Sequence, residues 1–170
     1  MEFLELAKKR YSVRQYEDRP VEEEKLRRVL EAGRVAPTGA NRQPQRILVV
    51  QSKEARAKVD EAARLYGAPV VLVVCAQVDE AWVRKYDGKN ISDIDAAIVT
   101  DHMMLEATQQ GLGSLWVCWF KPDVLRQALD IPEGWEPVNL LALGYAACEP
   151  ASPDRHDTLR KPLEETVWYK

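Results

Sequence analysis

The sequence has few residues of the kinds that build disulfide frameworks and metal sites. It holds three cysteines, Cys75, Cys118 and Cys148, which are far apart, and two histidines, His102 and His156. An odd number of widely spaced cysteines argues against a disulfide framework and against a cysteine-based metal site. We therefore expect no metal ion, and the expected location is a reducing cytoplasm.

Long apolar runs and an excess of one charge are also missing. The longest apolar run, residues 68–76, is less than half of the ~20 residues that a membrane span needs. The first residues show no basic region followed by an apolar stretch, so no signal peptide is predicted. Lysine and arginine number 24 against 27 aspartates and glutamates, a net charge of −3. This balance gives no general attraction to nucleic acid or to an anionic membrane, and we expect neither partner.

The 170 residues have the size and ordinary composition of one globular domain, and we predict a single domain over residues 1–170. Ser52 is predicted to cap a helix, and Ser92 with Asp95 to form a capping box. Helices are predicted over residues 3–9, 21–35, 53–66, 92–110 and 122–129, and strands over 46–51, 70–76, 115–120 and 138–145. From the residues alone, this alternation favours a parallel sheet.

Arginine and serine alternate just after the first predicted helix, in Arg10-Tyr-Ser12-Val-Arg14. In an extended segment, residues 10, 12 and 14 point to the same side. Two guanidinium groups and a hydroxyl on one side suit a phosphate group. A plainer interpretation stays open, in which Arg10 sits at a helix C-terminus and Arg14 is solvated.

Residues 36–44 predict a loop with the chemistry to contact a flat ligand. Gly39 allows close approach of the backbone, and Thr38 offers a hydroxyl. Asn41 and Gln43 carry the paired donors and acceptors that read the edge of a planar heterocycle. The open alternative is a polar loop punctuated by prolines.

Later segments give weaker signals. One is the segment Gly111-Leu-Gly-Ser-Leu-Trp-Val117. It is either the end of a helix before a strand, or a stretch of backbone that lies against a flat ligand. It does not complete the phosphate-binding motif G-x-G-x-x-G, because Trp116 stands where that motif needs glycine. Arg160 and Lys161 are solvated charges or a second clamp on an anion. The sequence has no P-loop, no nucleophile elbow around Ser114 and no arguable carboxylate pair. An enzyme with this sequence is therefore expected to rely on a cofactor.

Together these segments resemble the nitroreductase family of FMN-dependent oxidoreductases, in its short single-domain form, over nearly the whole chain. The motifs, in order, are Arg10-x-Ser12-x-Arg14, Ala36-Pro-Thr-Gly-Ala-Asn-x-Gln-Pro44, the Asp95-started helix ending in Gly111-Leu-Gly-Ser-x-Trp116, Leu143-Gly-Tyr145 and Arg160-Lys-Pro162. The resemblance implies an α+β fold with a central, mainly antiparallel sheet flanked by helices, in place of the parallel sheet. It also implies an intertwined homodimer with FMN at its interface and a C-terminal arm across the other subunit.

The resemblance also implies the cofactor contacts. Arg10, Ser12 and Arg14 look like contacts of the FMN phosphate and ribityl chain, with Arg160 and Lys161 as a second phosphate clamp. The remaining contacts match a loop that reaches FMN from the partner subunit and a strand edge near the isoalloxazine ring: Pro37, Thr38, Gly39, Asn41 and Gln43 in the loop, and Leu115, Trp116 and Val117 in the strand. No catalytic side chain is implied, because flavin N5 carries the hydride.

The sequence departs from the family at Gln45, where an aromatic residue often follows Gln-Pro, and at Ala146, where proline commonly follows Gly-Tyr. It also lacks the longer helical excursion that covers the flavin in larger members. We hypothesise that residues 77–91 line or cover the substrate face, with Trp82 or Tyr86 beside the flavin. The alternative is a surface loop whose aromatic residues pack on the core.

The resemblance implies transfer of electrons from NADH or NADPH through FMN to nitroaromatic compounds, quinones or similar electron-poor acceptors, in a two-step (ping-pong) mechanism. Two alternatives stay open. One is a protein that stores FMN or senses redox state with little turnover. The other is a family member with specialised chemistry, such as dehalogenation or flavin cleavage.

Overall fold

The computed structural model describes residues 2–170. The helices are α1 (Phe3–Lys9), α2 (Glu23–Val35), α3 (Lys53–Asp60), α4 (Ser92–Gln109), α5 (Pro122–Leu129), α6 (Arg155–Leu159) and α7 (Leu163–Thr166), with 3-10 turns η1 (Gly39–Asn41) and η2 (Val78–Glu80). The strands are β1 (Gln45–Val50), β2 (Val70–Gln77), β3 (Val83–Arg84), β4 (Lys89–Asn90), β5 (Gly113–Val117) and β6 (Trp135–Gly144). Where an element was predicted, its bounds lie within a few residues of the predicted ones, except that α3 ends well before residue 66. The strands β3 and β4 and the short helices α6 and α7 were not predicted.

The central sheet has the strand order β1-β2-β6-β5, and each neighbouring pair is antiparallel. This confirms the arrangement that the family resemblance implies, and the parallel sheet favoured by the alternation of elements is wrong. The apolar run in β2 is buried almost throughout, which is the pattern of a parallel strand. An antiparallel strand has the same pattern when helices cover both faces of its sheet.

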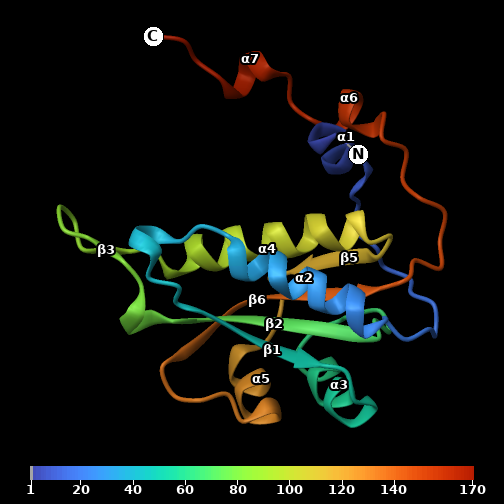
Figure 1. Cartoon of the computed structure of the whole chain (residues 1–170), viewed down its shortest axis with the longest axis horizontal. Helices are drawn as coiled ribbons and strands as arrows, with labels where there is room; N and C mark the ends of the chain where they lie inside the picture. The colour runs from blue at the N-terminus through green and yellow to red at the C-terminus, as the bar shows by residue number, and fades with distance from the viewer. Residues whose placement is uncertain (1) are drawn as a thin grey trace.

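Helices cover both faces of this sheet (Figure 1). On one face, α2 and α4 pack over Leu72 and Val74 of β2. On the other face, α3 and α5 lie over a second core that contains Val71 and Val73. Successive residues of β2 therefore enter different cores, as strand geometry requires. Residues of β6 pack in both cores, and Leu115 of β5 packs in the second, so the helices on the two faces position these strands.

The predicted caps fare differently. Ser52 caps α3 as predicted, since its Oγ accepts a backbone N–H from the first turn at 3.1 Å. The capping box of Ser92 and Asp95 is wrong, because Ile91 is the N-cap residue of α4 and Ser92 already belongs to the helix. The Asp95 carboxylate instead accepts the backbone N–H of Gly39 at 2.9 Å, and Gly39 lies 56 residues earlier in the chain.

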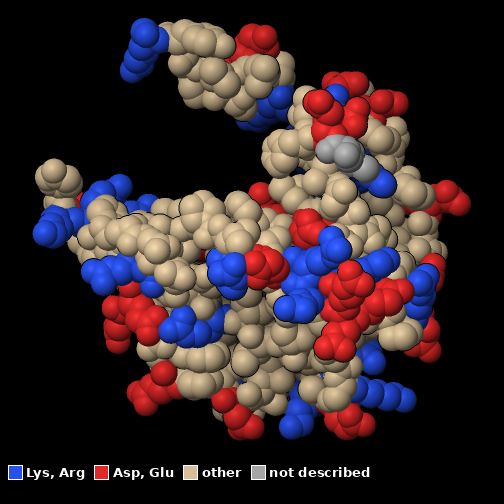
Figure 2. Space-filling model, in the orientation of Figure 1, with Lys and Arg blue, Asp and Glu red and all other residues tan. Residues whose placement is uncertain are grey.

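Two segments project from the body of the protein (Figure 1). The first is the β3–β4 hairpin between β2 and α4, which was not predicted as strands. The second is the C-terminal arm, residues 160–170, which Figure 2 shows extending over open space. Within residues 160–170 the structure has no strand, and Trp168 and Tyr169 are 77% and 95% exposed. Within residues 2–170, no helix combines the length and the apolar character that a membrane crossing requires.

Candidate functional site

The segment after α1 is extended along β5, as predicted. Ser12 forms a parallel bridge with Ser114, and the Val13 N–H donates to the Ser114 carbonyl at 2.9 Å. Val13 is fully buried, so Ser12 and Arg14 face outward, and both are exposed. Gly113 permits this approach, because a Cβ there would lie 2.7 Å from Val13 Cγ2. The backbone therefore presents the hydroxyl and the guanidinium together.

Positive charge collects around Arg10 at the end of α1. Burial lowers the pKa of Arg10, and the nearby positive charges of Arg155 and Arg160 lower it further, while the carboxylate of Asp101 opposes them. Like charges held together in this way favour binding of an anion, which would relieve their repulsion. The structure thus brings together two predicted anion contacts, Arg10 and Arg160, that are 150 residues apart in sequence.

Arg155 is a residue of this cluster that the sequence analysis missed. Its guanidinium donates to the carbonyl oxygens of Lys8 at 3.1 Å, Arg10 at 2.5 Å and Ser152 at 2.7 Å. The last carbonyls of a helix lack partners within the helix, so Arg155 satisfies the end of α1 and ties it to α6. A lone arginine in a polar tail carries no local signal for this role. Lys161, which was predicted to form a phosphate clamp with Arg160, is exposed on the arm.

A cavity of about 710 Å³ lies between the end of α1, the end of α4 and the chain after β6. Its walls include Arg10, Tyr11, Leu112, Tyr145 and Cys148. Burial raises the pKa of Tyr11, and contact with Cys148 raises it further. Among the predicted site residues of the described chain, Arg10 alone lines this cavity.

The predicted strand contacts lie on β5, at the edge of the sheet. Beyond the bridge to Ser12, part of the backbone of residues 115–117 faces outward, and such groups can bond the edge of a ligand. Ser114 is 2% exposed, and its Oγ has no hydrogen-bond partner in the part of the chain described. Trp116 and Val117 are half-buried and Leu115 is buried.

The loop of residues 37–43 is ordered by its own hydrogen bonds. The Asn41 N–H donates to the Thr38 carbonyl at 3.0 Å, and the Gln43 N–H donates to Thr38 Oγ1 at 3.0 Å. Ala40, Asn41 and Gln43 have positive φ angles of 47°, 55° and 53°. Residues other than glycine rarely adopt this backbone conformation, and backbone strain of this kind is concentrated at ligand-binding sites. Pro37, Asn41 and Gln43 are exposed.

The β3–β4 hairpin starts against this loop. An added Cβ at Gly39 would lie 2.4 Å from Ile91 Cδ1 and 3.1 Å from Trp82 Cβ. Trp82 and Ile91 thus flank Gly39 from the two ends of the hairpin. Trp82 is half-buried, whereas Tyr86 at the tip is 99% exposed. The two aromatic residues that were expected to lie beside the flavin are therefore placed differently: Trp82 packs at the base of the hairpin, and Tyr86 is exposed at its tip.

Within one chain, the predicted contacts form two separate groups. The loop and hairpin lie at the start of α4, whereas α1 and the arginine cluster lie toward its end (Figure 1). A helix of 18 residues is about 27 Å long. The two groups therefore lie near opposite ends of α4 within one chain (Figure 1).

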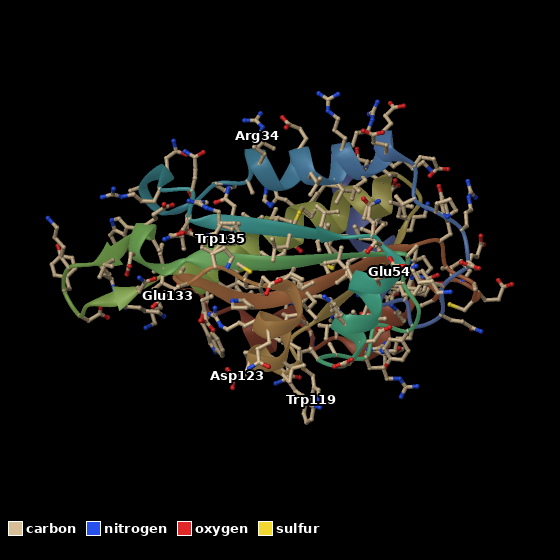
Figure 3. All side chains as sticks on the ribbon, turned by 90° about the horizontal axis from the view of Figure 1, so that it is seen from below. Arg34, Glu54, Trp119, Asp123, Glu133 and Trp135 are labelled. Atoms are coloured by element: carbon tan, nitrogen blue, oxygen red, sulfur yellow. The ribbon has the colours of Figure 1, made fainter. Side chains whose placement is uncertain are left out.

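Several large apolar side chains are exposed near these groups. They are Phe3 and Leu4 of α1, Leu159, Leu163 and Trp168 of the C-terminal segments, and Ile94 of α4. Trp119, between β5 and α5, also projects outward (Figure 3). Residues 2–170 contain no cluster of three or more histidine, cysteine or carboxylate side chains arranged to hold a metal ion.

Comparisons with known proteins identify the family of the chain. A model described as Nitroreductase family matches residues 7–65 and 61–145. The crystal structure of a nitroreductase family protein from Clostridium difficile 630 is 54% identical and covers 100% of this chain and 99% of that chain, with a TM-score of 0.98. A Desulfovibrio desulfuricans protein solved in complex with FMN is 25% identical, with coverage of 100% and 97% and a TM-score of 0.83. The NADH dehydrogenase of Thermus thermophilus is 32% identical in an alignment of 197 positions, which covers 96% of this chain and 94% of that protein. The chain belongs to the nitroreductase family.

Proposed function

We propose that this protein is an FMN-dependent oxidoreductase, which passes electrons from NADH or NADPH to nitroaromatic compounds, quinones or similar electron-poor acceptors. The observation that supports the proposal is the group of positive charges at Arg10, Arg155 and Arg160, which lies at the start of the extended segment that exposes Ser12 and Arg14. This donor set has the charge and hydroxyl content that a phosphate monoester requires. Family membership and the FMN bound to the Desulfovibrio relative support the choice of cofactor.

The chain's residues would hold the cofactor at two places. Arg10, Arg14 and Arg160 bind the phosphate, with Lys161 as a further cation, while Ser12 contacts the phosphate or the ribityl chain. The outward backbone of β5 at Leu115, Trp116 and Val117 bonds the edge of the isoalloxazine ring. Bound FMN supplies the hydride and electron transfer itself, so no side chain acts as a nucleophile. The protein orients the ring and stabilises negative charge at its edge.

The active unit in this proposal is a homodimer, because one chain keeps its two groups of contacts apart. The loop residues Pro37, Thr38, Gly39, Asn41 and Gln43 then reach the FMN held by the other subunit. The C-terminal arm lies across that subunit, which would bury Val167, Trp168 and Tyr169. Exposure of the arm in a single chain supports this arrangement.

The hairpin completes the substrate side in the proposed dimer. Its base packs against the loop, since Trp82 lies close to Gly39. Trp82 would border the ring, and Tyr86 would cover the acceptor. Donor and acceptor use this space in turn, which makes the kinetics ping-pong. We also propose that all of residues 1–170 act as one domain and that the enzyme works in the cytoplasm.

The first experiment is the visible spectrum of the purified protein, with release and identification of any chromophore. We expect flavin bands and about one FMN per chain, in keeping with one phosphate site per subunit. Steady-state oxidation of NADH or NADPH with a quinone then separates an enzyme from a flavin store. A colourless protein that fails to bind added FMN would overturn the cofactor assignment and every contact named above.

A further inference from the structure

Asp95 is a buried carboxylate in the first turn of α4. It is 1% exposed, and its Oδ1 accepts the Gly39 N–H at 2.9 Å. Its Oδ2 is buried and has no hydrogen-bond partner within residues 2–170. The positive end of the α4 dipole stabilises a negative charge at this position. A buried carboxylate is expensive to maintain, so its single bond to a distant loop calls for a physical reason.

The bond joins the middle of the loop to the rigid body of the protein. The hydrogen bonds of residues 38–42 other than this one, such as that from the Arg42 N–H to the Gly39 carbonyl at 3.0 Å, stay within the loop, while Arg46 of β1 donates to the carbonyl of Gln43, at the end of the loop, at 3.2 Å. Left-handed residues Ala40 and Asn41 follow Gly39 directly. Such a conformation persists only when its surroundings hold it in place. Asp95 holds the chain by one atom immediately before the strained pair.

The same point receives support from the hairpin. Ile91 immediately precedes α4, and Trp82 precedes β3; both pack closely against Gly39. The Ile91 N–H also donates to the Trp82 carbonyl at 3.2 Å. The loop, the base of the hairpin and the start of α4 thus meet at one glycine. Movement of the loop would break the Asp95 bond and open this packing together.

We propose that Asp95 is a positioning residue for the cofactor site. It fixes the loop of residues 37–43, so that the loop reaches the FMN of the other subunit already in its binding conformation. Preorganised contacts bind more tightly, because less conformational freedom is lost on binding. The role in FMN binding rests on the proposed function, whereas the anchoring of the loop does not.

Two substitutions separate anchoring from mere burial of a charge. Asp95→Asn keeps an oxygen acceptor for the Gly39 N–H, whereas Asp95→Ala removes it. We expect Asp95→Ala to raise the FMN dissociation constant by about tenfold, the equivalent of one hydrogen bond to a charged group. Amide hydrogen exchange of residues 38–43 in the cofactor-free protein should accelerate in parallel. Asp95→Asn should restore both properties to near wild-type values.

Thr100→Val is the matched control for loss of stability. Thr100 is fully buried on the same helix, and its hydroxyl contacts Asn139 Oδ1 at 3.1 Å without touching the loop. We expect it to lower Tm while loop exchange and FMN affinity stay unchanged. The proposal is overturned if Asp95→Ala leaves loop exchange unchanged, if Asp95→Asn behaves like Asp95→Ala, or if Thr100→Val weakens FMN binding equally. A wild-type protein that binds no FMN refutes the proposed function, and loop exchange then still tests the anchor.

Discussion

The hydroxyl of Tyr145 donates a hydrogen bond of 2.5 Å to Oε2 of Glu22. Tyr145 immediately follows β6, and Glu22 immediately precedes α2, so this bond ties the sheet to the first long helix. The Arg19 guanidinium lies over the Tyr145 ring at 3.8 Å from its centroid, and Lys25 Nζ donates to the Tyr145 hydroxyl at 2.8 Å. Because Tyr145 also lines the cavity beside Arg10, this cluster fixes one wall of it.

The cluster predicts a defined loss of stability in acid. The Tyr145 bond, followed by the backbone N–H of Glu22 and by Arg19 and Lys25, lowers the pKa of Glu22 from 4.5 to about 2. A carboxyl with a lower pKa in the folded state stabilises the fold above pH 4.5, and this contribution is lost as the pH falls toward 2. The free energy of unfolding of Glu22→Gln, measured by urea denaturation, should therefore change less with pH between these values than that of the wild-type protein. Glu23→Gln, on the same exposed turn, is the control. If the unfolding free energy of Glu22→Gln changes with pH as steeply as that of the wild-type protein, the prediction is contradicted.

The arginines of the proposed phosphate site should act on cofactor retention without an equal effect on folding. Arg14 and Arg160 are exposed, so Arg14→Ala and Arg160→Ala remove charge but little packing. We expect each to weaken FMN binding by about tenfold, a magnitude typical of a charge-assisted contact. Fluorescence titration of the cofactor-free protein with FMN measures this. Arg64→Ala, a change at an exposed arginine against Tyr66, should bind FMN normally.

Arg155 should affect both the end of α1 and the anion site. Arg155→Ala leaves the Arg10 carbonyl without its donor and the Lys8 carbonyl with only the His156 ring nitrogen at 3.2 Å, which should cost about 1–3 kcal/mol of unfolding free energy. Arg155→Lys keeps the positive charge near Arg10 but cannot reproduce the forked bonds. Lysine should therefore preserve more FMN affinity than alanine while rescuing little stability in chemical denaturation. Equal FMN affinity in the two variants would show that the charge of Arg155 contributes nothing.

Local patterns in the sequence predicted the longer helices and the strands of the central sheet, because periodicity and end signals lie within each element, whereas the short β3, β4, α6 and α7 were missed. The helix of residues 122–129 matches its predicted bounds, and Ser52 caps α3 as expected. The direction of strand pairing was not determined in the same way. A strand such as β2, covered on both faces, reads as a continuous apolar run in either arrangement. The family resemblance supplied what the local pattern did not.

The candidate site shows the same division. The extended segment that leaves Ser12 and Arg14 exposed on either side of buried Val13 was predicted from neighbouring residues, whereas Arg10 lines the cavity and its direction relative to them stays a prediction. Asp95 and Arg155 were misjudged or missed, because their partners lie 56 and 145 residues away. The sequence pattern of Asp95 also fits a capping box, so the residues alone could not distinguish the two roles.

The exposed arm should control the oligomeric state. Leu163, Trp168 and Tyr169 are exposed in the single chain, and their burial against a second copy would provide a large apolar contact. Deleting residues 163–170 should shift the protein from dimer toward monomer in sedimentation equilibrium, with loss of bound FMN. The double variant Trp168→Ala, Tyr169→Ala should shift it in the same direction by a smaller amount. A full-length protein that is monomeric at all concentrations would contradict the dimer.

The aromatic residues of the hairpin differ in exposure, and this difference predicts separable effects. Tyr86 is 99% exposed, so Tyr86→Ala should leave Tm and FMN affinity unchanged while raising KM for a quinone or nitroaromatic acceptor. Trp82 packs against Gly39, so Trp82→Ala should lower Tm, alter the flavin spectrum and change turnover together. Its matched comparison is Trp82→Phe, which keeps an aromatic ring against the loop and should recover much of the affinity. If Trp82→Ala leaves the spectrum, stability and turnover at wild-type values, the hairpin has no part in covering the substrate, and the space beside the loop is open to solvent.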